Sequence, residues 1–140
     1  MHKGVNMGET YFDFLRKRMN MPKREVSGKV VAVDFDGTIT KDNRFPEVIG
    51  VVRDGCKEAI DYIRQKNKVV LWTCRCGEYL DEAIRFLQEN GIEVDAVNDD
   101  IYGKYGKTDR KIMADIYIDD KNIFCTEVDW AEVKRWFEGK

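Results

Sequence analysis

The chain has 140 residues, of which 24 are basic and 26 acidic, and its formal net charge at pH 7 is −2. This length fits one domain with a substantial core, and the balanced charge excludes a global field that would attract nucleic acid or an anionic membrane. No apolar stretch approaches the about 20 residues that span a bilayer, so no membrane partner is expected. The four cysteines and the lack of a signal peptide predict a cytoplasmic location.

The first 28 residues differ in composition from the rest of the chain. The predicted organisation is an N-terminal helical segment and linker at 1–28, followed by a single domain at 29–140. A short helix is predicted at 9–19, and Pro22 lies in the linker. Aromatic residues such as Tyr11 give this helix a docking face, which would either fold over the domain or join subunits into a homo-oligomer. The alternative is a frayed leader.

An apolar run that begins at Val30 ends in two carboxylates, Asp34 and Asp36. This pattern predicts a strand buried on both faces, and Gly37 marks where the chain turns out of the sheet. Both acids are therefore expected at the C-terminal edge of the strand, where open α/β sheets bind ligands. Packing them there without a cation would raise at least one pKa, so the pair indicates a bound metal. The alternative is a pair of turn-forming aspartates that caps the next segment.

After an irregular stretch at 41–52, predicted strands and helices alternate to the end of the chain. Apolar stripes at helical spacing indicate the helices, and Gly91 ends the second one. Asp54 is the predicted N-cap of the first helix, and Asp129, with Glu132 three residues later, opens the last. The elements are a helix at 54–66, a strand at 68–73, a helix at 78–90, a strand at 93–98, a loop at 99–109, a short helix, a strand at 115–119 and a final helix. Their alternation predicts an α/β fold with a doubly wound parallel sheet and helices on both faces.

Polar groups stand at the ends of the predicted strands, and a doubly wound sheet would bring them to one crevice. In chain order they are Asp34 and Asp36, Thr73, Lys111, and Asp119 with Asp120.

With these groups in this order, the chain resembles the haloacid dehalogenase (HAD) superfamily. Asp34-Phe35-Asp36-Gly37-Thr38 matches the Asp-x-Asp-x-Thr motif, while Thr73, Lys111 and the pair Asp119-Asp120 match the second, third and fourth motifs. The resemblance covers residues 29 to about 125. It implies a Rossmann-like core, Mg²⁺ as cofactor and a phosphatase that acts through an aspartyl-phosphate.

The resemblance also implies a role for each residue at the strand ends. Asp34 would be the nucleophile and a metal ligand. Asp36 would protonate the leaving oxygen and then activate water, and its backbone carbonyl would reach the metal. Thr73 would donate a hydrogen bond to the phosphoryl oxygens, and Lys111 would offset negative charge.

One acid of the pair Asp119 and Asp120 is expected to bind Mg²⁺ directly and the other through water or a hydrogen bond. The reason is that adjacent residues leaving a strand point opposite ways. A turn directly after Ile118 would favour Asp120 for the direct contact.

Several assignments have alternatives. Lys104 and Lys107 are rivals of Lys111 for the cationic role, and Arg75 either contacts substrate phosphate or flanks its loop. The predicted substrate-binding set is Gly37, Thr38, Cys74 and Arg75. A zinc site at Cys74 and Cys76 is disfavoured because a Cys-x-Cys pair with one histidine lacks the usual ligand spacing.

The leading hypothesis is a Mg²⁺-dependent phosphomonoester hydrolase. The intervals 40–53 and 98–111 are too short for an inserted cap domain of on the order of 50 residues, so a capless enzyme is expected. Its open site would suit a small substrate or a phosphorylated macromolecule, including a 3′-phosphate at a nucleic-acid end. The alternatives are a phospho-acceptor switch domain and a catalytically inactive partner-binding domain. Asp36 argues against the switch, because an acid there would hasten hydrolysis of the acyl phosphate.

Overall fold

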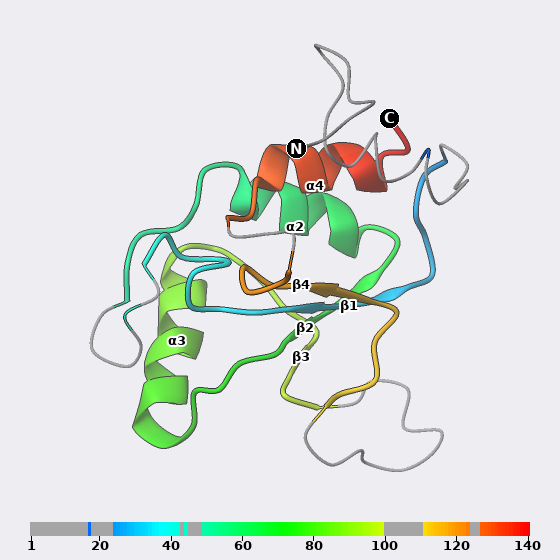
Figure 1. Cartoon of the computed structure of the whole chain (residues 1–140). Coiled ribbons are helices and arrows are strands. Elements are labelled where there is room, and N and C mark those ends of the chain that lie inside the picture. Colours follow the sequence, from blue (N-terminus) through cyan, green and yellow to red (C-terminus); the bar gives the residue numbers. More distant parts are fainter. Residues whose placement is uncertain (1–16, 18–23, 43, 45–48, 100–110, 124–126) are drawn as a thin grey trace.

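The structure, a computed structural model, describes residues 17, 24–42, 44, 49–99, 111–123 and 127–140. These residues form a four-stranded, all-parallel sheet and three helices (Figure 1). The elements are β1 (Val30–Val33), α2 (Cys56–Arg64), β2 (Lys68–Leu71), α3 (Gly77–Glu89), β3 (Ala96–Val97), β4 (Ile116–Ile118) and α4 (Trp130–Phe137). The predicted helix at 9–19 and residues 100–109 of the predicted loop lie outside the described residues.

The strand order is β3-β2-β1-β4, and every neighbouring pair is parallel. The chain therefore runs outward from β1 through β2 to β3, and then returns to the other side of β1 to form β4. The order reverses between β1 and β4, which is the topological switch point at which open α/β sheets bind ligands. This confirms the predicted α/β fold with a parallel sheet and is consistent with a Rossmann-like core.

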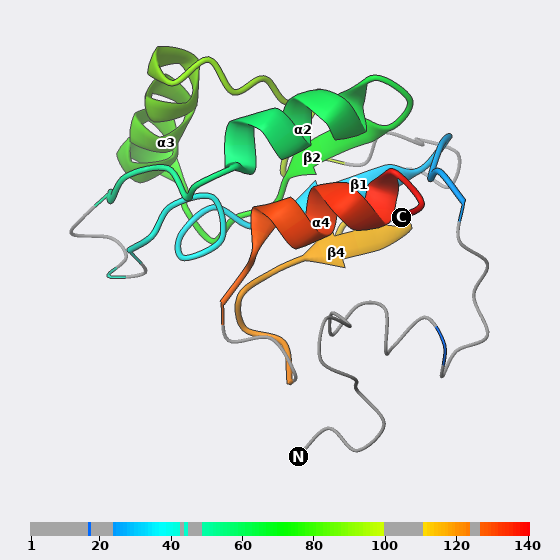
Figure 2. The same ribbon diagram turned by 90° about the horizontal axis from the view of Figure 1, so that it is seen from above.

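α2 and α4 cover one face of the sheet, and α3 lies beside the strands, toward their carboxyl ends (Figures 1 and 2). Val31 and Val33 of β1 point to this face and belong to one buried cluster with Ile60 of α2, Leu87 of α3 and Val133 of α4. α2 and α4 lie side by side over the sheet, as both views show. On each of these two helices, apolar residues three and four positions apart form a stripe, and this stripe is buried against the sheet.

The opposite face carries a smaller cluster built from the alternate strand residues. Val30 and Ala32 of β1 lie on it with Ile112, and the rings of Trp72 and Tyr117 meet edge to face at 5.2 Å between their centroids. The prediction of helices on both faces is thus not met within the described residues. The β3 to β4 connection, which right-handed crossovers would place here, lies mostly outside them, and no helix occurs at 111–114, where the predicted short helix would end.

One predicted helix cap is confirmed and one is wrong. The Asp129 carboxylate accepts hydrogen bonds from the backbone N–H groups of Ala131 and Glu132, and so caps α4. Asp54 does not cap α2. Gly55 occupies the N-cap position with a φ of 78°, and the Asp54 carboxylate is exposed.

The described strands are shorter than predicted, and β3 shrinks from 93–98 to two residues. The Asp95 carboxylate accepts the backbone N–H of Val69 at 2.7 Å, so a side chain replaces a strand contact there. Among the described residues, no helix is long and apolar enough to cross a membrane.

Candidate active site

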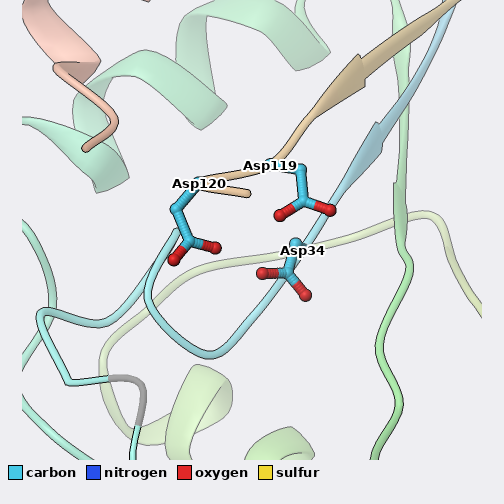
Figure 3. A group of neighbouring side chains, drawn as sticks. All are labelled: Asp34, Asp119 and Asp120. Carbon is cyan, nitrogen blue, oxygen red and sulfur yellow. The ribbon is translucent and has the colours of Figure 1, made fainter. Parts of the chain in front are cut away.

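Three carboxylates meet at the carboxyl edge of the sheet, at the switch point between β1 and β4. Asp34 follows β1 directly, and Asp119 and Asp120 follow β4. The backbone N–H of Asp34 donates to the carbonyl of Ile118 at 3.0 Å, so the strand ladder continues up to the first acid. Each side chain offers an oxygen within 4.8 Å of the others, and Figure 3 shows the three turned toward one another. The structure thus brings together three of the four predicted metal ligands, Asp34, Asp119 and Asp120.

Asp119 and Asp120 both offer an oxygen to the cluster. Both carboxylates lie in the same cluster because the chain leaves the strand geometry directly after Ile118 and turns at Asp120. They differ in their surroundings. Asp120 is buried, whereas Asp119 is half-buried and accepts the backbone N–H of Lys121 at 3.1 Å. Which of them binds a metal directly stays a prediction.

The Thr38 hydroxyl contacts two of the three acids in the cluster. It lies 3.0 Å from an Asp34 oxygen and 3.1 Å from an Asp120 oxygen, and it accepts the backbone N–H of Asp120 at 3.0 Å. Since a hydroxyl has a single hydrogen, it donates to one carboxylate at a time. Thr38 is fully buried, and the indole N–H of Trp130 donates to its carbonyl at 2.8 Å. In the structure Thr38 is therefore buried against Asp34 and Asp120, whereas the sequence predicted that it contacts the substrate.

Gly37 allows the loop that carries Thr38 to turn. Its φ is +83°, a backbone conformation that residues with a side chain rarely adopt. Its carbonyl accepts a hydrogen bond from Arg53 Nε at 3.0 Å. Gly37 is buried, and its predicted role in substrate binding stays a prediction.

We expect Thr38→Val to weaken both the fold and the acid cluster. Valine keeps the shape but removes the acceptor of the Asp120 N–H and the single hydroxyl donor that lies between the two carboxylates, which costs about 1 to 3 kcal/mol of unfolding free energy. Thr40→Val is the matched control, because Thr40 is also buried but its hydroxyl binds only main-chain atoms. Calorimetry should show that Thr38→Val alone weakens Mg²⁺ binding. Equal Mg²⁺ affinity in the two variants would contradict this role of Thr38.

The electrostatics of the cluster favour a bound cation. Burial and the neighbouring charge of Asp119 raise the pKa of Asp34 to about 7, although the hydrogen bond from Thr38 opposes the shift. Burial also raises the pKa of Asp119, and Asp120 adds to that shift. Hard oxygen ligands that repel one another are the donor set preferred by Mg²⁺, so the residues present fit this ion.

We expect Mg²⁺ to stabilise the protein, and to do so more strongly at higher pH. The folded-state pKa of Asp34 exceeds its usual value of 3.8, so the folded chain binds more protons than the unfolded chain between about pH 4 and 7. The stability of the metal-free protein therefore falls as the pH rises through this window. Mg²⁺ needs the ionised carboxylates and reverses the loss.

Thermal unfolding with excess Mg²⁺ and with excess EDTA checks this prediction. The Tm difference should be several degrees at about pH 8 and close to zero at about pH 5. Asp54→Asn, which changes an exposed carboxylate, should behave like the wild type. A Tm difference that does not depend on pH would contradict the assignment of the cluster to a cation.

Asp36 lies outside this group of three and is held by Arg75. Arg75 Nε donates to one carboxylate oxygen at 2.8 Å and Nη2 to the other at 2.7 Å. The Arg75 side chain is fully buried and that of Asp36 is 12% exposed. The sequence left Arg75 either as a phosphate contact or as a loop residue. The structure instead turns it inward, into a two-pronged ion pair across 39 residues of sequence.

Thr73 follows β2 at the same edge of the sheet. Its backbone N–H donates to Asn98 Oδ1 at 2.8 Å, and its carbonyl accepts Asn98 Nδ2 at 3.1 Å. Its hydroxyl oxygen accepts a hydrogen bond from the backbone N–H of Arg75 at 3.1 Å, and the hydroxyl hydrogen takes no part in that bond. The neighbouring Cys74 and Cys76 are exposed free thiols. The substrate-binding role predicted for Cys74 stays a prediction.

Lys111 is exposed, and its Nζ lies 5.1 Å from the ring centroid of Tyr117. Its role as the cation of the site stays a prediction. The rivals Lys104 and Lys107 lie outside the described residues.

Three residues that support the site were not identified from the sequence, namely Arg53, Asn98 and Trp130, and the pairing of Arg75 with Asp36 was not predicted. All three residues bind main-chain atoms of residues distant in sequence, and no local motif indicates such contacts. Asn98 alone has a local signal, because it is polar and ends a predicted strand.

Comparison with known proteins shows one informative similarity. No protein-family model matches the chain, and no curated protein matches it. The structure of a conserved protein from Bacteroides thetaiotaomicron is similar, with a TM-score of 0.67 and 37% sequence identity. The similarity covers 76% of this chain and 86% of that one, so it extends over most of both folds.

Proposed function

We propose that this chain, which belongs to the same family as the conserved protein from Bacteroides thetaiotaomicron, is a Mg²⁺-dependent phosphomonoester hydrolase of the HAD type. The observation that carries the proposal is the convergence of Asp34, Asp119 and Asp120 at the switch point of the sheet. A nucleophilic carboxylate beside two further acids supplies both an attacking oxygen and hard ligands for a cation. The relationship to the Bacteroides protein supports the fold and adds no activity.

In the proposed mechanism, a carboxylate oxygen of Asp34 attacks phosphorus, and the bond from phosphorus to the leaving oxygen breaks. Asp34, Asp119, Asp120 and the Asp36 carbonyl would hold Mg²⁺, which neutralises charge when an anionic phosphate approaches a carboxylate. Asp36 serves as general acid for the leaving oxygen and then as general base for the water that hydrolyses the aspartyl-phosphate. Thr73 donates a hydrogen bond to the phosphoryl oxygens, and Lys111 offsets their charge.

The proposal includes a capless enzyme with an open site. Its substrate is a phosphorylated small molecule or macromolecule, with a nucleic-acid 3′-phosphate as one specific class. Residues 1–28 or a second subunit would close the site. A reducing cytoplasm is the proposed location, in keeping with the free thiols of Cys56, Cys74 and Cys76.

A second candidate function is a phospho-acceptor switch. The observation that favours it is the ion pair between Asp36 and Arg75, which engages both oxygens of the acid that would otherwise hasten dephosphorylation. The two functions differ in the lifetime of the aspartyl-phosphate.

Hydrolysis of p-nitrophenyl phosphate with Mg²⁺ tests the proposed function. Release of p-nitrophenol should require Mg²⁺ and stop in excess EDTA. A screen of phosphorylated metabolites, nucleotides and 3′-phosphorylated oligonucleotides then identifies the substrate class. Full activity in EDTA, or no hydrolysis of any of these compounds, would refute the hydrolase.

A further inference from the structure

A continuous chain of hydrogen bonds runs along the carboxyl edge of the sheet. It begins at Asn98, after β3, whose side-chain amide binds both main-chain polar groups of Thr73. It continues from the Thr73 hydroxyl to the backbone N–H of Arg75, and from the Arg75 guanidinium to the Asp36 carboxylate. The network therefore crosses from β3 past β2 to the turn after β1, and two of its members have proposed roles in the reaction.

The Arg75 side chain is fixed from several directions. Besides its two bonds to Asp36, Nη1 donates to the carbonyl of Tyr79 at 3.3 Å, and the guanidinium carbon lies 5.3 Å from the centroid of the buried Phe35 ring. A planar guanidinium that binds both oxygens of a carboxylate fixes the orientation of that carboxylate as well as its position. A lysine ammonium has no such fork, so the geometry depends on arginine.

Asn98 is fixed by its backbone. Its φ is 48°, an uncommon value for a residue other than glycine, and asparagine is among the residues that adopt it most readily. This conformation ends β3 and lets the amide pair with the Thr73 main chain, as a strand neighbour would. The position of Thr73 is thus set from β3.

We infer that Arg75 and Asn98 are positioning residues, Arg75 for Asp36 and Asn98 for Thr73, joined in one network through the hydroxyl and backbone of the turn after β2. This inference rests on the proposed hydrolase function. In this role neither residue contacts the substrate: the Arg75 guanidinium, which was predicted from the sequence to belong to the substrate-binding set, binds Asp36 and the carbonyl of Tyr79. Each acts by holding a reacting group within the narrow range of positions that catalysis requires, where a displacement of about 1 Å costs about 10²-fold in rate.

A double-mutant cycle on kcat tests the role of Arg75. Arg75→Gln should lower kcat about 10²-fold with little change in KM, and Arg75→Lys should recover only part of the loss. In an Asp36→Asn background, Arg75→Gln should change kcat by less than about threefold, because the group that it positions no longer acts. Active-site titration by burst amplitude corrects for any unfolded fraction. An equal loss of kcat in the two backgrounds would overturn the inference for Arg75.

Asn98→Gly tests the second residue and does not remove a buried charge. Glycine adopts the same backbone conformation and deletes only the two bonds to Thr73, so the protein should fold while kcat falls about tenfold. Asn90→Gly is the matched control. Asn90 is exposed at the end of α3, away from the network, and this variant should keep the wild-type kcat. Wild-type kcat in Asn98→Gly would overturn the inference for Asn98.

A parallel cycle on thermal unfolding separates the failure of this inference from that of the proposed function. If Asp36 and Arg75 couple in stability but the wild type hydrolyses no phosphate ester, the hydrolase proposal and the catalytic role of the network both fall. If the enzyme is active and the two residues couple in stability but not in kcat, only the positioning role falls. Coupling in both measurements supports the inference.

Discussion

Replacing Asp34 with Asn is expected to abolish phosphomonoester hydrolysis, with kcat reduced about 10⁴-fold or more, the scale seen when a covalent nucleophile is removed. An amide oxygen does not attack phosphorus as a carboxylate does, so no aspartyl-phosphate forms. The variant should fold. Asn has the shape of Asp, can still accept from Thr38, and removes one of three crowded negative charges. Its Tm without metal at about pH 8 should therefore equal or exceed that of the wild type.

The measurement is steady-state hydrolysis of p-nitrophenyl phosphate by the purified variant with saturating Mg²⁺. Asp61→Asn is the matched control, because it makes the same change at an exposed residue that pairs with Lys57 on α2. Asp61→Asn should retain full activity. If Asp34→Asn retained the wild-type rate, the covalent mechanism would be wrong, and the acid cluster would need another function.

The position of the acid cluster was predictable because it depends on topology and not on detailed packing. An apolar strand followed by acids, repeated at β1 and β4, places both groups at one edge of any parallel sheet. Alternation of strands and helices predicts that sheet from the sequence alone. The cap at Asp129 was predictable for a similar reason, because its hydrogen bonds reach only two and three residues along the chain.

The inward position of Arg75 was not predictable from local pattern. A charged residue between two cysteines is expected to face solvent while the thiols are buried, and the structure has the reverse arrangement. The cause is Asp36, a partner 39 residues away, whose carboxylate satisfies the buried guanidinium. Only the three-dimensional fold reveals such a pairing.

Turn geometry explains the other differences. An aspartate caps a helix when its backbone is extended and its carboxylate faces the first N–H groups of the helix. At α2 the N-cap residue is Gly55 in a left-handed conformation, so Asp54 precedes the cap and its carboxylate faces solvent. A turn also follows β4, because the strand ends at Ile118 and the chain turns at Asp120, beside the acid cluster. Such changes of direction take one or two residues, and composition alone does not locate them.

Replacing Asp36 with Asn is expected to slow turnover by about 10² to 10⁴-fold, because each positioned acid or base contributes on that scale. Asn can neither protonate the leaving oxygen nor accept the proton of the attacking water. Breakdown of the aspartyl-phosphate should therefore slow, and the phosphorylated form should accumulate. The change also removes one acceptor from the buried Arg75, so the variant is expected to be less stable than the wild type.

Rapid-quench trapping in acid of the phospho-enzyme, which as an acyl phosphate is acid-stable and alkali-labile, measures this step, and the burst amplitude gives the fraction of molecules that are folded and active. Asp61→Asn again serves as the control for the substitution itself, and should show the short-lived intermediate of the wild type. The outcome separates the two candidate functions. A wild-type acyl phosphate that persists for minutes, with no longer lifetime in Asp36→Asn, would favour the phospho-acceptor switch, because Asp36 would then contribute nothing to dephosphorylation. A short wild-type lifetime that lengthens in the variant would establish Asp36 as the base of a hydrolase.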